Sequence, residues 1–215
     1  MKAIAINASP RKGKNTAELL EAALKGAGEA GAETSLINLI DLKFSGCVSC
    51  FGCKKLGENG ETTKFCFVRD DLGPVLASCM EADAVFVGSP IYVSDVTGLF
   101  RNFFERLTFM NISYGNFPDP FKGKISFGLF YTTNAPQEAV EKMYWPMFEG
   151  HKGMLERIFH GKAALYAATD TLQFDDYSKY DSGNFSEEKK RKRRKEQFPK
   201  DLEEARKIGF SLIAR

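Results

Sequence analysis

The feature that most constrains the fold of this chain is a polar loop near its start, residues 7–16, with the sequence NASPRKGKNT. The loop follows the apolar run 3–6 and precedes a segment whose apolar residues recur at helical spacing. A buried strand that turns through such a loop into a helix points backbone N–H groups at the space above the strand end. The loop therefore predicts an open α/β sheet with an anion, most simply a phosphate, at the strand tip.

The side chains of this loop suit a phosphate. Neutral donors come from Ser9, Asn15 and Thr16. Arg11 can present a forked guanidinium to phosphate oxygens, and Lys12 or Lys14 a point charge. The alternative is a helix start whose basic residues are only solvated. The loop alone leaves both interpretations open.

Composition limits the class of protein. With 215 residues and 43% hydrophobic content, the chain fits one domain with a sizeable core, residues 1–215. No apolar run approaches the ~20 residues that span a bilayer, and Met1 leads straight into a strand rather than a signal-peptide core. We expect a cytoplasmic protein with no membrane partner. The net charge of +2 requires neither nucleic acid nor an acidic surface as a partner.

Periodicity predicts strands that alternate with helices, which is typical of a parallel sheet. The expected strands are 2–7, 34–39, 84–88, 124–131 and 162–168, and the expected helices are 16–30, 72–82, 98–107, 137–159 with a kink or break at Pro146, and 187–214. Residues 26–31 match G-x-G-x-x-G by letter. Because they end a helix instead of following a strand, we reject a dinucleotide site there.

A second strand-tip loop, residues 89–94, follows the third strand. Ligands in open α/β sheets bind at the carboxyl ends of strands where the strand order reverses, which places this loop beside the first one. Pro90, Ile91 and Tyr92 would form a rigid apolar shelf on which a flat aromatic ring can rest. The alternative is an ordinary turn with a core tyrosine.

Four of the five cysteines cluster in an inserted loop at about 44–69. They are Cys47, Cys50, Cys53 and Cys66. Two-residue gaps let successive thiolates surround one centre, as an iron–sulfur cluster or a tetrahedral zinc requires. The twelve residues 54–65 form a long segment between the third and fourth cysteines. A loop of free thiols therefore stays open as a third interpretation. Cys79 lies apart, on a predicted helix, and we expect a core residue there.

Three motifs occur together: residues 9–11 with 15–16, the cysteine loop running into 70–71, and residues 89–92 followed by 97–98. In this combination the chain resembles the NADPH-dependent FMN reductases of flavodoxin-like fold, in the branch that includes iron–sulfur flavoproteins. The resemblance spans at least residues 1–107. It implies a flavodoxin-like three-layer sandwich with a five-stranded parallel sheet ordered 2-1-3-4-5.

The resemblance also implies a cofactor site. The FMN phosphate would be held by Ser9, Arg11, Gly13, Asn15 and Thr16. The ribityl chain and ring would be lined by Pro90, Ile91, Tyr92 and Val93. From the position of the fourth strand tip we expect Thr132 and Thr133 at the flavin edge. In the iron–sulfur members the cysteine motif carries a [4Fe-4S] cluster, and Cys47, Cys50, Cys53 and Cys66 stand in the matching places, with a longer last gap than is usual.

The implied activity is electron transfer from NAD(P)H through FMN to a flavin, quinone or other acceptor. The flavin carries that chemistry, so we assign no catalytic residue. The alternative is an iron–sulfur flavoprotein that transfers electrons through the cysteine cluster to a protein partner. Flavin sites that commonly lie at subunit interfaces in the family favour a homodimer or higher homo-oligomer.

The last part of the chain carries two unusual segments. Residues 171–185 are aromatic and acidic, and could cover a neighbouring subunit's flavin or pack on their own sheet edge. Residues 189–195 are all basic. Because glutamates flank them and a helical apolar stripe follows, we expect the solvated first half of a terminal helix, not a nucleic-acid site. His151 and His160 have no ligand-like partner at helical spacing, so we expect surface or packing roles.

Overall fold

A computed structural model describes residues 1–58, 62–63, 65–115 and 121–214. Five parallel strands form the sheet: β1 (Lys2–Asn7), β2 (Glu33–Asn38), β3 (Ala84–Tyr92), β5 (Ile125–Thr132) and β6 (His160–Ala168). Their spatial order is β2-β1-β3-β5-β6, which confirms the predicted 2-1-3-4-5. The short strand β4 (Asp95–Val96) was not expected, and pairs antiparallel with the end of β3.

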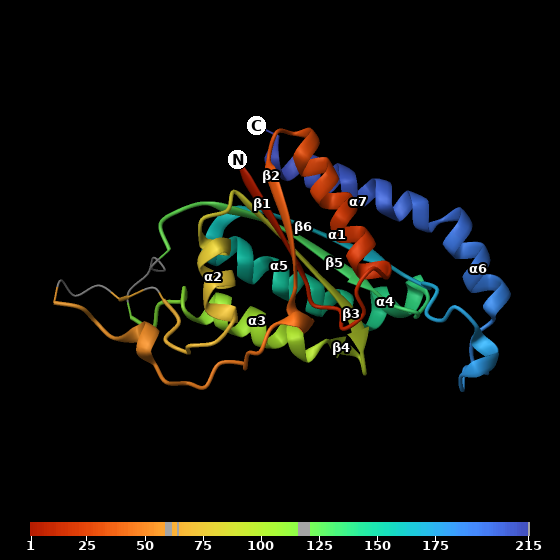
Figure 1. Cartoon of the computed structure of the whole chain (residues 1–215), viewed down its shortest axis with the longest axis horizontal. Coiled ribbons are helices and arrows are strands. Elements are labelled where there is room, and N and C mark those ends of the chain that lie inside the picture. The colour runs from red at the N-terminus through yellow and green to blue at the C-terminus, as the bar shows by residue number, and fades with distance from the viewer. Residues whose placement is uncertain (59–61, 64, 116–120, 215) are drawn as a thin grey trace.

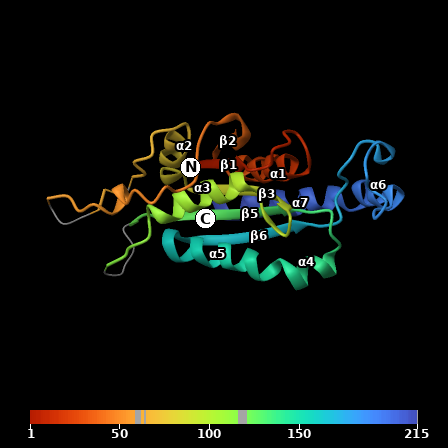
Figure 2. The same ribbon diagram turned by 90° about the horizontal axis from the view of Figure 1, so that it is seen from below.

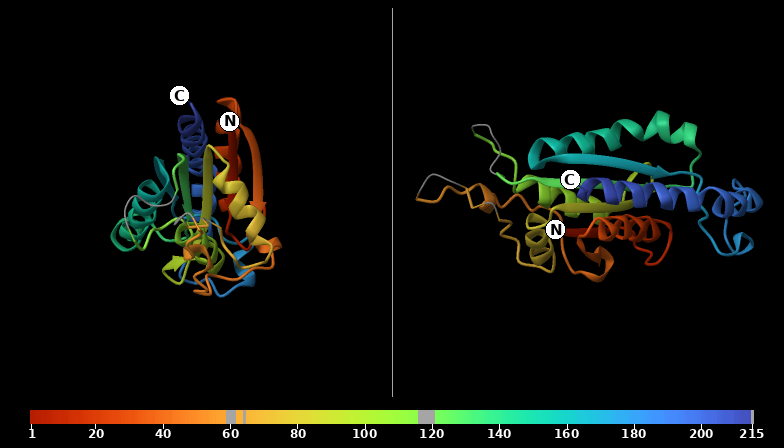
Figure 3. Two further views of the ribbon diagram at one scale, coloured as in Figure 1. Left: turned by 90° about the vertical axis from the view of Figure 1, so that its left-hand side faces the viewer. Right: turned by 90° about the horizontal axis from the view of Figure 1, so that it is seen from above.

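Helices cover both faces of the sheet (Figure 1). On one face α1 (Asn15–Glu29) and α7 (Phe198–Ile213) lie side by side. The other face carries α2 (Leu72–Met80), α3 (Gly98–Phe109), α4 (Gln137–Met143) and α5 (Trp145–Phe159). Single 3-10 turns occur at Leu39–Asp41, Gly52–Lys54 and Tyr177–Lys179. The end-on view in Figure 3 shows the helices arranged around the strands.

The two faces of the sheet bury different side chains, because successive residues of a strand point to opposite sides. In β1, Ala3 and Ala5 pack against α1 and α7, whereas Ile4 and Ile6 pack on the opposite side. All four are essentially inaccessible to solvent. This two-sided burial explains the continuous apolar runs of the strands.

Two glycines let α1 and α7 approach closely. A Cβ added to Gly26 would lie 1.9 Å from the carbonyl oxygen of Arg206, and one added to Gly209 would lie 1.9 Å from that of Ala23. The first glycine of the G-x-G-x-x-G match is therefore a helix-packing position, which agrees with rejecting a dinucleotide site.

Two predicted helices are each divided in two. α4 and α5 are separated at Tyr144, and Pro146 occupies the first turn of α5, which confirms the break expected there. The predicted terminal helix was wrong in one respect. It consists of α6 (Glu187–Glu196) and α7, with Gln197 between them and Pro199 in the first turn of α7.

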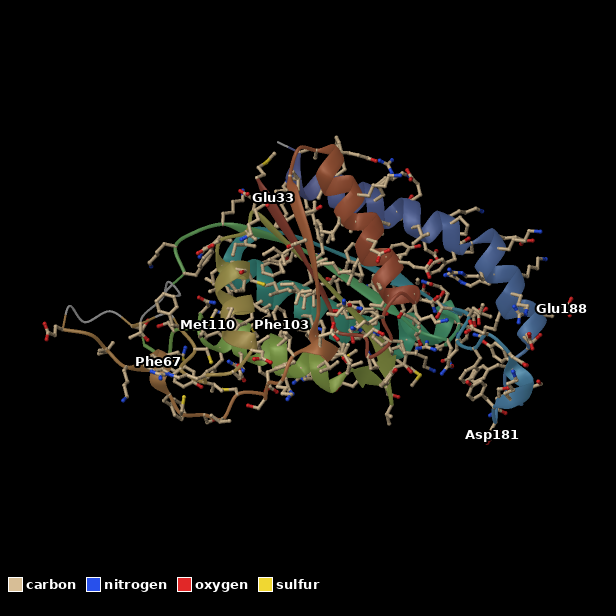
Figure 4. The ribbon with its side chains drawn as sticks, viewed as in Figure 1. Glu33, Phe67, Phe103, Met110, Asp181 and Glu188 are labelled. Atoms are coloured by element: carbon tan, nitrogen blue, oxygen red, sulfur yellow. The ribbon has the colours of Figure 1, made fainter. Side chains whose placement is uncertain are left out.

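The cysteine loop and α6 extend from opposite ends of the molecule (Figure 2). Phe67 labels the first end in Figure 4, and Asp181 and Glu188 label the second. No helix in the described part of the chain is both long and apolar enough to cross a membrane.

Candidate functional site: a pocket at the strand tips

One cavity of about 340 Å³ lies at the carboxyl ends of β1, β3 and β5. Its lining residues are Ser9, Arg11, Lys14, Asn15, Thr16, Pro90, Ile91, Tyr92, Val93, Thr132, Thr133, Asn134, Thr171 and Gln173. The structure thus brings together all the predicted cofactor residues except Gly13. That residue lies in the same loop with φ +62°, where glycine is favoured. The volume is within the range of small-molecule sites.

The first loop is shaped by its own polar side chains. The amide of Asn7 donates to Asn38 Oδ1 at 2.8 Å, and Asn7 Oδ1 accepts from the backbone N–H of Ser9 at 3.0 Å. Ser9 Oγ in turn accepts from the Arg11 N–H at 3.1 Å. These bonds fix the turn that follows β1 without using the exposed guanidinium of Arg11.

The start of α1 has no side-chain cap. Its N-cap residue, Lys14, carries no acceptor and makes no capping bond, so the first-turn N–H groups depend on another partner. An anion in the cavity would supply that partner and would interact favourably with the helix dipole. Lys14 also lines the cavity, whereas Lys12 forms an ion pair with Asp41 and is not among the lining residues.

The second loop was predicted as a plain strand-tip loop, and this was wrong. β3 continues to Tyr92 and turns back through Val93 and Ser94, which have φ of 49° and 65°. Positive φ at both central positions is the conformation of a type I′ two-residue hairpin turn. The hairpin exposes Tyr92 and Val93 at the rim of the cavity, because the turn extends beyond the sheet.

The floor of the cavity is polar and buried. The hydroxyl groups of Thr16 and Thr132 lie 2.8 Å apart and join α1 to β5. Among the lining residues, Lys14 had been named as one of two candidate phosphate-binding cations, whereas no cofactor role had been assigned to Thr171 and Gln173. The last two follow β6, so the rule that ligands bind at strand ends could have located them.

The four predicted metal ligands Cys47, Cys50, Cys53 and Cys66 line a second, smaller cavity of about 20 Å³. All four are free thiols. Four thiols are the donor set of an iron–sulfur cluster or a structural zinc. However, the described residues contain no group of three or more His, Cys, Asp or Glu side chains placed to hold a metal ion. The thiols therefore share a cavity without forming a preassembled metal site.

Arg106 of α3 connects the two ends of the cysteine loop. Its side chain is fully buried and pairs with Asp70 at 2.5 Å. It also donates to the carbonyls of Ser45 and Val68 at 3.1 and 3.3 Å, and its Nε lies 3.3 Å from Cys66 Sγ. Burial opposes the charged form of Asp70, but the hydrogen bonds from Arg106, Ser45 and Leu72, together with the charge of Arg106, outweigh it and lower the pKa of that carboxyl.

The carboxylates at 70 and 71 have separate roles. Asp70 Oδ1 accepts from the N–H of Leu72, the first residue of α2, at 3.2 Å, whereas the N-cap residue Asp71 makes no side-chain capping bond. Asp71 Oδ2 accepts from the N–H of Lys43 at 2.8 Å.

Within the cysteine cavity, burial raises the pKa of the Cys53 thiol, although the charge of Lys54 opposes this. Cys79 is a buried core residue as expected, and burial raises its pKa to about 12.

Lys54 links the cysteine loop to the segment after α3. Its Nζ donates to the carbonyl of Ile112 at 2.6 Å and to that of Phe109. The Phe51 ring also contacts the Tyr114 ring, with centroids 6.4 Å apart. Residues 111–122 are rich in glycine, proline and aromatic side chains, and their sequence predicts a loop near the flavin ring. Their described part before residue 116 instead lies against the cysteine loop, and residues 116–120 are outside the described residues.

Both histidines have the packing and surface roles expected of them. His151 is buried, and its Nδ1 lies 3.0 Å from the Tyr131 hydroxyl. Burial, with the charge of Arg101, lowers the pKa of His151 to about 4. His160 is exposed at the start of β6.

Two kinds of comparison place this chain among known proteins. It is 32% identical over 145 residues to an iron–sulfur flavoprotein of Archaeoglobus fulgidus, a match that covers 66% of this chain and 60% of that protein. It is 33% identical over 114 residues to an iron–sulfur flavoprotein of Methanocaldococcus jannaschii, covering 53% of this chain and 55% of that protein. The chain therefore spans between half and two thirds of the length of these curated relatives.

Solved structures share the fold along almost the whole chain. An azoreductase from Bacillus anthracis superposes with a TM-score of 0.64 at 16% identity, covering 98% of this chain and 99% of that one. An NAD(P)H:quinone oxidoreductase from Methanothermobacter marburgensis gives 0.61 at 16% identity, covering 99% and 98%. The fold is flavodoxin-like. A family model described as NADPH-dependent FMN reductase matches residues 1–157, and the chain belongs to this family.

Proposed function

We propose that this protein is an FMN-dependent oxidoreductase that accepts hydride from NAD(P)H and passes the electrons to a flavin, a quinone or another small acceptor. One observation carries the proposal. A single cavity joins a basic loop before an uncapped helix start to an exposed aromatic hairpin, at the reversal point of a parallel sheet.

The cavity fits FMN at both ends. For the phosphate, Arg11 retains N–H donors beyond the one it uses within the protein, and α1 contributes its first-turn N–H groups. For the ring, Pro90 and Ile91 supply an apolar surface, and Tyr92 at the rim adds a partly exposed aromatic side chain. When bound, FMN supplies the hydride and electron-transfer chemistry.

The role of the chain's own residues is to bind and orient the FMN. The buried hydroxyls of Thr16 and Thr132 can exchange their mutual bond for bonds to a ligand, since each is both donor and acceptor. Among the described residues that line the cavity, none is a buried acid or base. The proposal therefore needs no proton-transferring side chain.

A second candidate is electron transfer through the cysteine loop, favoured by the four thiols that line one cavity. A [4Fe-4S] cluster held by Cys47, Cys50, Cys53 and Cys66 would require the loop to close further than it does here. Iron and sulfide analysis of protein purified without oxygen tests this. Stoichiometric iron and sulfide would support it, and iron-free protein with full reductase activity would dismiss it. A homodimer and a cytoplasmic location stay predictions.

The main proposal is tested by titrating the apo-protein with FMN and following the quenching of flavin fluorescence. We expect saturable binding, and bleaching of the bound flavin's absorbance when NADPH or NADH is added without oxygen. The double variant Arg11→Ala, Thr16→Ala should lose about tenfold or more in FMN affinity, since it removes charge-assisted hydrogen bonds.

The matched control is Lys25→Ala, because Lys25 is an exposed lysine of α1, the helix that contains Thr16, and does not line the cavity. It should bind FMN like the wild type. Wild-type protein that does not bind FMN, or a double variant that retains full affinity, would contradict the proposal.

A further inference from the structure

The phosphate end of the cavity is bordered by a segment outside the residues that match the family model. We call residues 170–175 the strap. Arg11 Nη1 donates to the Gln173 carbonyl at 2.7 Å, and Asn15 Nδ2 donates to the Leu172 carbonyl at 2.8 Å. Lys14 pairs with Asp175 at 3.2 Å. Three polar side chains of the phosphate loop are thus tied to the strap.

The opposite edge of the strap is bonded to the tip of β5. The backbone N–H and the hydroxyl of Thr171 both donate to the Thr133 carbonyl, at 2.9 and 3.0 Å. The Asn134 amide donates to Gln173 Oε1 at 2.8 Å. Thr171 and Gln173 therefore bridge two loops of the cavity and line it themselves.

The basic helix α6 holds the strap in place. Lys190 has a side chain only 4% exposed, and its Nζ donates to the Asn134 carbonyl at 2.6 Å and pairs with Asp170. Arg194 donates to Asn15 Oδ1 at 3.2 Å and to Glu18 at 2.7 Å. Figure 1 shows α6 beside the end of the molecule where the strand tips lie.

The prediction of a solvated basic run was therefore only half right. Lys189, Lys192 and Lys195 are exposed, whereas Lys190 and Arg194 face the site. Burying an ammonium group is costly unless it is paired and hydrogen-bonded, so Lys190 stays buried because Asp170 and the Asn134 carbonyl compensate it. The buried pair fixes the strap, and the strap fixes the side chains that would meet a phosphate.

We propose that the strap and α6 are part of the cofactor site. Thr171 and Gln173 are further residues that contact the bound mononucleotide near its phosphate. Lys190 is a positioning residue that preorganises Arg11 and Asn15 through the strap, and Arg194 is one that acts on Asn15 directly. This inference rests on the proposed FMN site and extends it to residues 170–194. Preorganised donors bind more tightly because less freedom is lost when the ligand arrives.

The test compares FMN with riboflavin, which lacks the phosphate. Apo-protein of the wild type and of Lys190→Met is titrated with each flavin by fluorescence quenching. We expect Lys190→Met to lose about tenfold in FMN affinity and less than about twofold in riboflavin affinity, because the defect is confined to the phosphate end. Lys190→Arg, which keeps the charge, should recover most of the FMN affinity.

Lys189→Met is the matched control, since it removes an exposed charge from the neighbouring position of the same helix. It should leave both affinities unchanged. Thr171→Val and Arg194→Gln repeat the test without removing the buried ammonium, and decide the matter if Lys190→Met fails to fold.

The outcomes separate the inference from the function on which it rests. Wild-type protein that fails to bind FMN overturns both. Wild-type binding with equal losses for FMN and riboflavin in the variants would show general loosening, and would overturn the inference alone. Unchanged FMN affinity in Thr171→Val and Arg194→Gln would do the same.

Discussion

The two candidate sites lie near opposite ends of helix α3 and are held in different ways. The strand-tip pocket is bounded by loops that follow β1, β3, β5 and β6, and neighbouring loops are joined by hydrogen bonds. The described residues of the cysteine loop form no strand of the sheet, and Arg106 and Lys54 tie the loop to α3 and to the segment after it. A site built on a sheet is formed before its ligand arrives, whereas a site built on a loop depends on a few contacts.

Helix α3 connects the two sites. Near its start, the Thr97 hydroxyl donates to the carbonyl of Ala8 in the phosphate loop at 2.7 Å. Arg106, nine residues later, faces the cysteine loop. A rise of 1.5 Å per residue places these positions about 14 Å apart along the helix. The contacts at the two ends of the helix share no residue, and positions farther apart than about 10 Å without shared partners usually respond independently, so we expect a defect at one end to have little effect at the other.

The largest expected effect comes from Arg106→Met. The change leaves Asp70 without its buried partner and removes the donors to both flanks of the cysteine loop. Breaking a buried ion pair costs about 3 kcal/mol, so we expect that loss in the free energy of unfolding measured with urea. The cysteines should also react faster with an alkylating reagent, while FMN affinity falls less than about twofold.

Arg101→Met on the same helix is the control, because Arg101 is exposed. It should change stability by less than about 0.5 kcal/mol. A large loss of FMN affinity in Arg106→Met would show that the cysteine loop and the strand-tip pocket are coupled, and would contradict the view that they are held independently.

Sequence reasoning located the pocket well because topology determines it. Parallel strands bring their carboxyl ends to one edge, so Ser9, Pro90 and Thr132 had to lie close together once the strand order was known. The hairpin at Val93 could not be foreseen, because a Val-Ser turn lacks the Asn or Gly that normally signals positive φ.

The rule that ligands bind at the carboxyl ends of strands, applied to the fifth strand, would have included Gln173. The aromatic composition of residues 171–185 instead suggested a subunit interface or packing on the sheet edge. The burial of Lys190 depends on Asp170, a partner 20 residues away that no periodicity reveals. At the cysteine loop, spacing indicated four ligands but not Arg106. The sequence places that arginine on a predicted helix and gives no further signal, since its partners lie 36 to 61 residues away in sequence.

An intermediate effect should come from His151, which packs between the two ends against Phe100 and Phe104 of α3. Its pKa is lowered to about 4 in the folded protein, against about 6.5 when unfolded. Between these values the unfolded chain binds the extra proton, so stability is complete above pH 6.5 and falls as the pH drops toward 4. We expect a loss of about 2 kcal/mol between pH 7.5 and pH 5, measured by urea unfolding.

His151→Gln should flatten this part of the pH dependence, and His160→Gln, which changes the exposed histidine, should not. Arg101 and Asp95 are the charged groups that act on His151, and both variants leave them in place. An equal slope in His151→Gln and the wild type would refute the assignment.

The smallest effect compares two exposed valines, one in each region. Val93 at the pocket rim has φ 49°, a conformation that costs a β-branched residue about 1–2 kcal/mol. Val48 in the cysteine loop is exposed as well but is not among the residues with positive φ. Asn tolerates the left-handed region, so Val93→Asn should raise the free energy of unfolding of the apo-protein by about 1 kcal/mol, and Val48→Asn should not raise it.

Since Val93 also lines the cavity, a gain in stability with weaker FMN binding would show that the turn retains strain in order to place an apolar side chain beside the ring. Equal responses of the two valines would mean that the hairpin is no more strained than the loop.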